Sequence, residues 1–221
     1  MIDKIVQNIK EAISDINDGA IILSSGFGDA GAPIKLLEAL AKENINNLTI
    51  VSNNAGEGNY GLATLLKAGK VSKIICSYPI SAGSIIFQDL YNSDKIKLEV
   101  IPQGTLSERM RAAGAGIGAF FTPTSARTKL GYGKETRMIE GIEHVLEHPL
   151  KGDVALILAK KADRLGNVIY DKSARNFGPI MAMAATTTIV EVEELVEIGE
   201  MDPELIITPS IFVDRVIVHN R

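Results

Sequence analysis

Three side-chain amides stand where predicted strands end, and they are the residues of this chain best suited to chemistry. Asn53 and Asn54 close one apolar run of strand length. Gln103 follows Pro102, which closes another run because proline offers no N–H to a ladder hydrogen bond. Amide N–H groups can hold a carboxylate or carbonyl oxygen. A glutamine amide beside backbone N–H groups also meets the requirements of an oxyanion hole.

Simpler structural roles fit the same amides about equally well. Asparagine is a common turn former at the end of a strand, and a polar residue at position 103 can cap the helix predicted for residues 105–113. Ligands of open α/β sheets bind at the carboxyl ends of the strands, so we still expect a site at this edge.

A glycine-rich segment, Gly26 to Gly31, follows a short apolar run and precedes a helical pattern, so it formally satisfies G-x-G-x-x-G. That spacing alone is as often a tight turn as a phosphate loop. A dinucleotide fold also needs Asp or Glu about 20 residues further on to hold a ribose hydroxyl, and this chain has Ser52, Asn53 and Asn54 there. The loop therefore suits a phosphorylated or pantetheine-bearing ligand, but the acidic ribose clamp is missing.

Other reactive residue types do not form a catalytic pattern. Cys76 lies inside the apolar string KIICSY, which predicts a buried, inert thiol. His144 and His148 have glutamates beside them and no third ligand nearby, so we expect a solvated element and no metal site. The sequence has no Gly-x-Ser-x-Gly elbow, no Walker loop and no histidine placed as a base. It predicts a receptive site without its own nucleophile.

Composition limits the class of protein. With 221 residues, 46% of them hydrophobic, we expect one domain spanning residues 1–221. A net charge of −4, no tryptophan and 5% aromatic residues argue against a nucleic-acid partner. The single cysteine fits a reducing, cytoplasmic location. The N-terminus does not resemble a signal peptide, and no apolar stretch is long enough to span a membrane.

The first half of the chain alternates between helix and strand patterns. Residues 2–17 have apolar residues at helical spacing, and short apolar runs then alternate with amphipathic stretches up to residue 113. This alternation predicts an α/β fold with a three-layer, open, mainly parallel sheet and helices on both faces. The expected strands cover residues 20–25, 48–52, 73–78 and 97–101, and the expected helices cover residues 33–41, 60–68, 85–91 and 105–113.

The second half is patterned differently. We expect a loop or hairpin over residues 131–150, paired strands around the turn at 164–167, and a helix over 174–185. Residues 186–196 and 211–218 are rich in β-formers, so we expect antiparallel strands to extend the same sheet late in the chain. Glu191, Glu193 and Glu194 should project from one edge of a strand and from the turn that follows it.

Five stretches, spread over nearly the whole chain, are more specific than the glycine loop alone: SGFGDAG (25–31), VSNNAG (51–56), IPQGTLSERMRAAGAGIGAFFTPT (101–124), KADRLGNVIYDKSARNFGPIMAMAA (161–185) and VEVEELVEIGEMDPELIITPSIFVDRV (190–216). Together they resemble the A (α) subunit of family I CoA-transferases. Within that family the chain is most similar to the 3-oxoacid group, which includes acetoacetate and 3-oxoadipate CoA-transferases.

The resemblance implies a heteromeric enzyme, commonly two A and two B chains, that moves CoA from an acyl-CoA such as succinyl-CoA to a 3-oxo acid. In that family the thioester is attacked by a glutamate of the B subunit, which then holds CoA as a glutamyl thioester. The implied co-substrate is coenzyme A, with no tightly bound cofactor. Glu57 imitates the setting of that glutamate but lies beside the asparagine motif, so we interpret it as a loop residue.

The resemblance also assigns roles to individual residues. Asn53 and Asn54 match the paired amides that hold the acyl carboxylate, and Gln103 matches the glutamine that stabilises the oxyanion. Gly114 to Thr124 match a glycine-rich signature beside the intersubunit site. The segment assigned to CoA is matched by Ser25, Gly26, Phe27, Gly28, Asp29, Ala30 and Gly31.

Two departures from the family pattern bear on substrate choice. Ala113 replaces a common glycine, and Ser125-Ala126-Arg127 stands where relatives have a Gly-aromatic-Gly turn. Arg127 is either a partner for the distal carboxylate of a substrate or a solvated arginine on a loop. Other hypotheses are the A subunit of an acetate- or butyrate-type CoA-transferase, a nicotinamide-dependent oxidoreductase, and a non-enzymatic ligand sensor on a sugar-isomerase-like fold.

Overall fold

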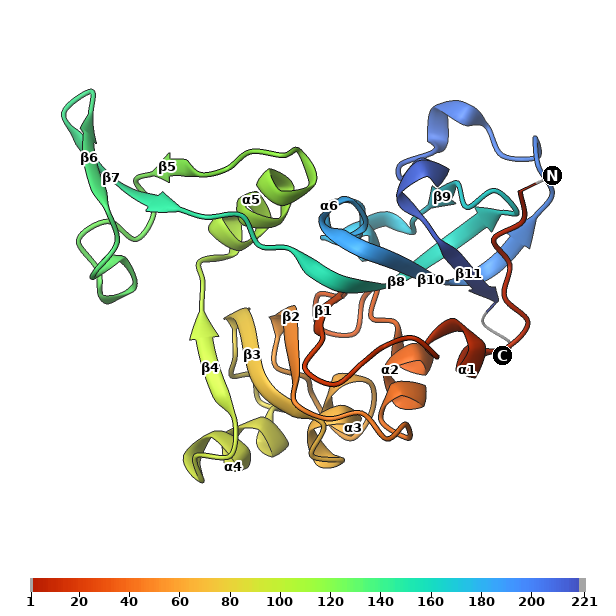
Figure 1. The fold of residues 1–221 in the computed structure, drawn as a ribbon, viewed down its shortest axis with the longest axis horizontal. Helices are drawn as coiled ribbons and strands as arrows, with labels where there is room; N and C mark the ends of the chain where they lie inside the picture. Colours follow the sequence, from red (N-terminus) through yellow and green to blue (C-terminus); the bar gives the residue numbers. More distant parts are fainter. Residues whose placement is uncertain (1, 219–221) are drawn as a thin grey trace.

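A parallel sheet runs through the centre of the molecule (Figure 1). The computed structural model describes residues 2–218, and within them the strands follow the order β11-β10-β8-β1-β2-β3-β4, with β9 paired to β8. Every neighbouring pair along that path is parallel. The strands are β1 (Ile21–Ser24), β2 (Leu48–Asn54), β3 (Val71–Tyr78), β4 (Lys97–Val100), β8 (Gly152–Asp163), β9 (Val168–Ile169), β10 (Ala185–Val196) and β11 (Arg215–Val218).

Helices cover both faces of this sheet (Figure 1). Successive residues of a strand point to opposite faces, so the apolar strands present side chains on both faces for helices to bury. On β2, Ile50 belongs to one apolar core and its neighbour Val51 to the other; Ile74 and Ile75 on β3 divide in the same way. The first core lies against α1 to α4, and the second lies against α5 and α6. The helices are α1 (Ile9–Ala12), α2 (Ile34–Leu40), α3 (Leu62–Lys67), α4 (Ile85–Asn92), α5 (Gln103–Gly114) and α6 (Gly178–Ala184).

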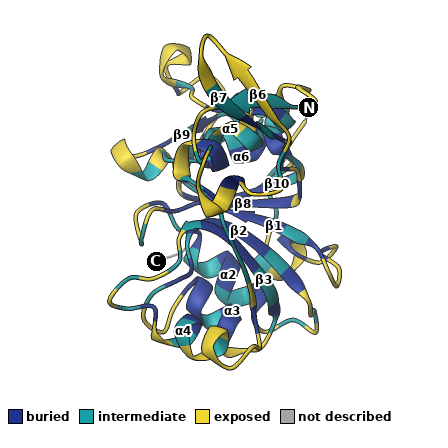
Figure 2. Cartoon of the chain, turned by 90° about the vertical axis from the view of Figure 1, so that its left-hand side faces the viewer, coloured by how far each residue is buried: buried dark blue, intermediate teal, exposed yellow. Residues whose placement is uncertain are grey.

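The predicted fold class, a three-layer and mainly parallel α/β sheet, is confirmed. Figure 2 shows the central strands buried between their helices. The strands β2, β3 and β4 lie on one side of β1, and β8, β10 and β11 lie on the other. This reversal of strand order beside β1 is the kind of place where open α/β sheets bind ligands.

The antiparallel strands lie mostly outside the central sheet. A hairpin of β6 (Thr136–Ile139) and β7 (Ile142–Glu147) pairs with β5 (Phe120–Thr122) in a separate three-stranded sheet that extends away from the main body (Figure 1). The hairpin predicted for this region is therefore confirmed. The late strands β8, β10 and β11 join in parallel instead, and among residues 2–218 only β9 pairs antiparallel within the large sheet. An apolar run shows that a strand is buried, but it does not show the direction of its neighbour.

The helix expected over residues 2–17 is much shorter than predicted. Only Ile9–Ala12 is α-helical, with Asn8 capping it through a hydrogen bond from the Glu11 backbone N–H. The residues before it lie along β11, where the Val6 N–H donates to the Val216 carbonyl at 3.0 Å. Tertiary pairing outweighs a weak local helix preference in this segment.

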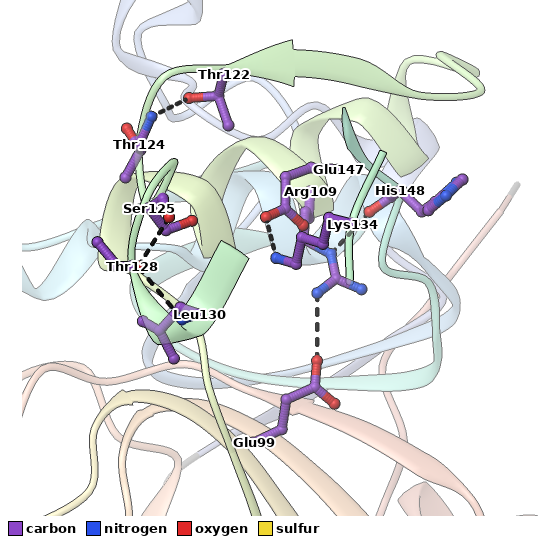
Figure 3. A network of polar contacts seen from close by, with 10 residues as sticks. All are labelled: Glu99, Arg109, Thr122, Thr124, Ser125, Thr128, Leu130, Lys134, Glu147 and His148. Atoms are coloured by element: carbon purple, nitrogen blue, oxygen red, sulfur yellow. Dashed lines mark hydrogen bonds and ion pairs between the residues drawn. The ribbon is translucent and has the colours of Figure 1, made fainter. Parts of the chain in front are cut away.

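A polar network anchors α5, the helix that begins with Gln103 (Figure 3). Arg109 donates to the His148 carbonyl at 2.7 Å and to Glu99 on β4 at 3.3 Å. Lys73 on β3 binds the other oxygen of Glu99 at 2.5 Å. Burial alone would raise the pKa of Glu99, but Lys73 and Arg109 outweigh it and lower that pKa. Helix α5 is thus tied to two strands and to the segment after the hairpin.

The loop that departs from the family pattern keeps a left-handed backbone. Ser125 and Arg127 have φ angles of 68° and 60°, the region that glycine favours. Arg127 is largely exposed and pairs with Glu143 of the hairpin at 2.7 Å. The Arg127 side chain is therefore solvated on its loop, as the second alternative held, and it also pairs with a neighbouring carboxylate of the hairpin.

Candidate functional site

Gln103 and Asn53 meet at the carboxyl edge of the sheet. The Gln103 Nε2 donates to Asn53 Oδ1 at 2.7 Å, and the Ser77 hydroxyl donates to the same oxygen at 2.8 Å. Asn53 is 4% exposed, whereas Gln103 is exposed at the start of α5. The short link between β4 and α5 brings the two residues together, because β4 ends at Val100 and α5 begins at Gln103, directly after Pro102.

Asn54 has its amide oriented by the backbone. Its Oδ1 accepts from the Gly56 N–H at 3.0 Å, and a backbone N–H can only donate, so this oxygen is identified without ambiguity. The Asn53 oxygen accepts two hydrogen bonds, from Ser77 and Gln103. Both asparagines therefore use their oxygens within the protein and have N–H groups left for a ligand. A ligand of matching chemistry carries acceptor oxygens.

A cavity of about 570 Å³ opens over these amides. Its wall includes residues from the ends of three strands, the glycine loop and the start of α5: Phe27, Gly28, Asn53, Asn54, Glu57, Ser77, Tyr78 and Gln103. Phe27 and Tyr78 are 57% and 61% exposed. They add apolar surface to a cavity that also contains the polar amides. The cavity has the size of a small-molecule site.

The glycine loop contributes unequally to that cavity. Phe27 and Gly28 reach its wall, whereas Ser25 is buried and binds the Gly31 carbonyl at 2.6 Å and the Leu158 N–H at 3.1 Å. The Ser25 side chain therefore shapes the loop.

The other residues of the segment assigned to CoA also hold the loop in place. Gly26 is buried, and the Phe27 and Ala30 backbones hydrogen-bond each other. Asp29 accepts from the Tyr60 hydroxyl at 2.6 Å, which raises the pKa of that phenol. This bond ties the loop to the segment before α3.

Gly31 packs against another part of the chain. A Cβ at this position would lie 2.2 Å from the Ala174 carbonyl oxygen, and the φ of +80° also favours glycine. Ala174 belongs to the 3-10 turn η2 (Lys172–Arg175). This glycine is thus required for close approach between two segments that are distant in sequence.

The first turn of α2 already contacts an acidic side chain. The Leu36 N–H donates to Glu191 Oε2 at 3.1 Å, and Glu191 is 1% exposed. The expectation that Glu191 projects from a strand edge is wrong, because Glu191 is buried on β10, which lies between β8 and β11. Glu193 and Glu194 are exposed, as expected. In a dinucleotide fold this helix terminus binds the pyrophosphate. The occupied N–H argues against the oxidoreductase alternative.

Cys76 and Glu57 lie where the sequence predicted them. Cys76 is fully buried, and burial raises the pKa of its thiol to about 12, as expected of an inert cysteine. Glu57 lies in a loop after β2, as predicted, but it also reaches the cavity wall. Among residues 2–218, no helix combines the length and apolarity needed to cross a membrane.

Sequence reasoning missed Ser77 and Tyr78 as residues of the site. The register of β2 with β3 places Ser52 beside Cys76 and Asn54 beside Tyr78, so Ser77 lies next to Asn53. In the sequence, Ser77 is recognisable only as a polar residue after the apolar core of a strand. Its contact with Asn53 follows from the pairing register, which the sequence does not show.

The chain belongs to the coenzyme A transferase family, whose model matches residues 6–219. Among known proteins it is 56% identical over 217 residues to the A subunit of 3-oxoadipate CoA-transferase from Acinetobacter baylyi, covering 98% of this chain and 95% of the relative. It is also 44% identical over 215 residues to the A subunit of a probable succinyl-CoA:3-ketoacid coenzyme A transferase from Bacillus subtilis, covering 97% and 90% of the two chains. The predicted family is confirmed.

Solved structures share the fold. The acyl-CoA transferase YdiF of Escherichia coli O157:H7 has a TM-score of 0.84 at 22% identity. The match covers 98% of this chain and 47% of that one. At this identity the likeness concerns the fold, and it agrees with the predicted α/β class.

Proposed function

We propose that this chain is the A subunit of a 3-oxoacid CoA-transferase that moves CoA from an acyl-CoA such as succinyl-CoA to a 3-oxo acid. The observation that carries the proposal is the meeting of Gln103, Asn53 and Asn54 on one cavity wall. The names of the two relatives support this class of substrate. We place the protein in the cytoplasm, with coenzyme A as co-substrate.

In this proposal the chain supplies recognition and charge stabilisation. Asn53 and Asn54 donate N–H groups to the carboxylate or carbonyl oxygens of the acid. Gln103 donates to the oxygen that becomes negative when the thioester carbonyl is attacked. Phe27 and Gly28 present the glycine loop to the acyl-CoA. Since the amides are in place before the reaction, little reorganisation accompanies the development of charge.

The attacking carboxylate comes from a partner in this proposal. The family resemblance puts the nucleophilic glutamate on the B subunit, in a complex commonly of two A and two B chains. That carboxylate adds to the thioester carbon, the C–S bond breaks, and the released thiolate then attacks the glutamyl carbon to displace the acid. A second acid reverses these steps.

Two structural features support a partner at the cavity. Phe27 and Tyr78 expose apolar surface at its wall, as expected of residues that another chain covers. The chain also matches about half of the longer acyl-CoA transferase chain. Its own sheet is continuous, which supports our proposal that residues 1–221 are one domain, of which residues 1 and 219–221 lie outside the described part.

The test is reconstitution with a B chain from the same genome. Each chain alone should be inactive, and the pair should exchange CoA between succinyl-CoA and a carboxylic acid with the parallel-line kinetics of a ping-pong mechanism. Acetoacetate, 3-oxoadipate, butyrate and acetate should be compared as acceptors, with a 3-oxo acid expected to be best. A folded, stable pair that exchanges CoA with none of them contradicts the proposal.

A further inference from the structure

We propose that Ser77 is a positioning residue of this site, holding the Asn53 amide with its NH2 group toward the cavity. The inference rests on the proposed function, since it explains how Asn53 is prepared to receive a substrate oxygen. Ser77 lies at the carboxyl end of β3, and no part of the family resemblance assigned it a role.

Hydrogen-bond geometry carries the proposal. The Ser77 Oγ lies 2.8 Å from Asn53 Oδ1, and Gln103 Nε2 lies 2.7 Å from the same atom. An amide oxygen has two lone pairs, so these two donors use its full accepting capacity. In this arrangement Asn53 can only donate to a ligand. The site therefore favours a ligand with an acceptor oxygen over an ammonium group, which can only donate.

Gln103 alone would not hold this arrangement. Its side chain is exposed at the first residue of α5, and two facing amides can both turn over and still form a hydrogen bond. Ser77 instead projects from a strand whose backbone is set by pairing with β2 and β4. Its hydroxyl has one proton, and the shorter distance, 2.8 Å to Asn53 Oδ1 against 3.1 Å to the Asn53 carbonyl oxygen, assigns that proton to the side-chain amide.

The expected effect follows from the role of Asn53. An amide that holds the carboxylic acid in both the bound state and the transition state changes KM more than kcat when it is misplaced. Loss of one neutral hydrogen bond changes an equilibrium by about tenfold. Ser77→Ala should therefore raise the KM for the acid about tenfold in the reconstituted enzyme, with kcat within about threefold of the wild type.

A pair of shape-matched variants separates the hydroxyl from the side-chain shape. Ser77→Thr keeps the hydroxyl and Ser77→Val has the same branched shape without it, and both residue types suit a strand. Threonine should restore the wild-type KM, and valine should behave like alanine. The matched control is Ser72→Ala, which removes a hydroxyl from the other end of β3, where it bonds the Asn47 carbonyl at 3.0 Å.

The kinetic result can overturn the proposal in two ways. If Ser77→Ala and Ser77→Val both keep the wild-type KM, Ser77 does not position Asn53. If threonine and valine raise KM equally, the effect comes from shape and the hydroxyl has no part. An inactive wild-type pair would instead count against the proposed function, and it would leave the role of Ser77 to a second measurement.

That measurement needs no partner chain. The side-chain NH2 resonances of Asn53 can be followed by NMR in the full chain, with the melting temperature of each variant recorded in parallel. Ser77→Val should shift these resonances and Ser77→Thr should leave them close to the wild type. Unchanged resonances in the folded valine variant would refute the positioning role whether or not the enzyme is active.

Discussion

Replacing Gln103 by alanine tests the chemical part of the proposed function most directly. In the free chain its amide makes one described side-chain hydrogen bond, to Asn53 at 2.7 Å. Asn53 Oδ1 would still accept from Ser77 in the variant. The structural loss is therefore one neutral hydrogen bond, worth about 0.5–1.5 kcal/mol, and no buried acceptor is left without a donor.

The catalytic loss should be larger than the structural one. Removal of one donor from an oxyanion hole costs about 2.7–4 kcal/mol, or about 10²–10³-fold in kcat. We therefore expect Gln103→Ala to lower kcat at least about 100-fold in the reconstituted enzyme. The melting temperature should fall by only about 2–4 °C, the shift expected for 1 kcal/mol in a domain of this size.

Two further variants sharpen the assay. Gln103→Glu keeps the shape but presents a carboxylate to a developing negative charge, so its kcat should be lower than that of Gln103→Ala. Gln7→Ala changes an exposed glutamine in the segment before α1 and should leave kcat unchanged. CoA transfer can be followed by the change in thioester concentration under saturating succinyl-CoA and acid.

The reasoning about Gln103 would be refuted by a variant that turns over within about twofold of the wild type, since that is far below the loss of an oxyanion donor. A fall in melting temperature well beyond that expected for one hydrogen bond would assign Gln103 to structure instead.

Three further substitutions and one chemical treatment test the backbone and the core. Gly31→Ala should destabilise the chain by about 2–4 kcal/mol in urea unfolding, through steric overlap and a positive φ; Gly19→Ala, with positive φ but open space, should cost about 1–2 kcal/mol. Ser125→Gly should raise the melting temperature by about 2 °C, because it relieves a φ of 68°. Cys76 has a pKa of about 12, so iodoacetamide at pH 8 should alkylate the folded chain about a thousandfold more slowly than the unfolded chain.

A specific result would contradict each of these predictions. Equal destabilisation by alanine at Gly31 and Gly19 would show that the approach to η2 is loose. A lower melting temperature for Ser125→Gly would mean that flexibility outweighs relief of strain. Rapid alkylation of Cys76 in the folded chain would show that β3 opens readily, since the thiolate is disfavoured there at every pH below about 12.

The placement of the amides could be predicted from the sequence. Apolar runs that end at Asn53 and at Pro102 define two strand ends, and parallel strands bring their carboxyl ends to one edge. The structure places Gln103 within hydrogen-bond distance of Asn53, as that reasoning requires. Local patterns were sufficient because each amide lies immediately beside the strand end that positions it.

Ser77 and Glu191 could not be predicted in the same way. Ser77 contacts Asn53 only because β2 and β3 pair in one particular register. Glu191 lies in a string of alternating glutamates, which is typical of an exposed strand, yet its partner is the Leu36 N–H, 155 residues away. The prediction of a helix over residues 2–17 failed for a related reason, because its partner β11 is the last strand of the described residues.

The contact between Glu191 and α2 has a consequence for protein design. An engineer who wished to turn this glycine-rich turn into a nucleotide pocket would naturally redesign the turn itself. The obstacle is Glu191, which is distant in sequence from the glycine-rich turn. Its side chain already accepts from the Leu36 N–H, a backbone amide that a diphosphate would need. Glu191→Ala, which removes the acceptor from the Leu36 N–H, is therefore the first substitution of such a redesign. Motif searches based on glycine spacing should also check the neighbouring strands for an acidic residue at the helix terminus.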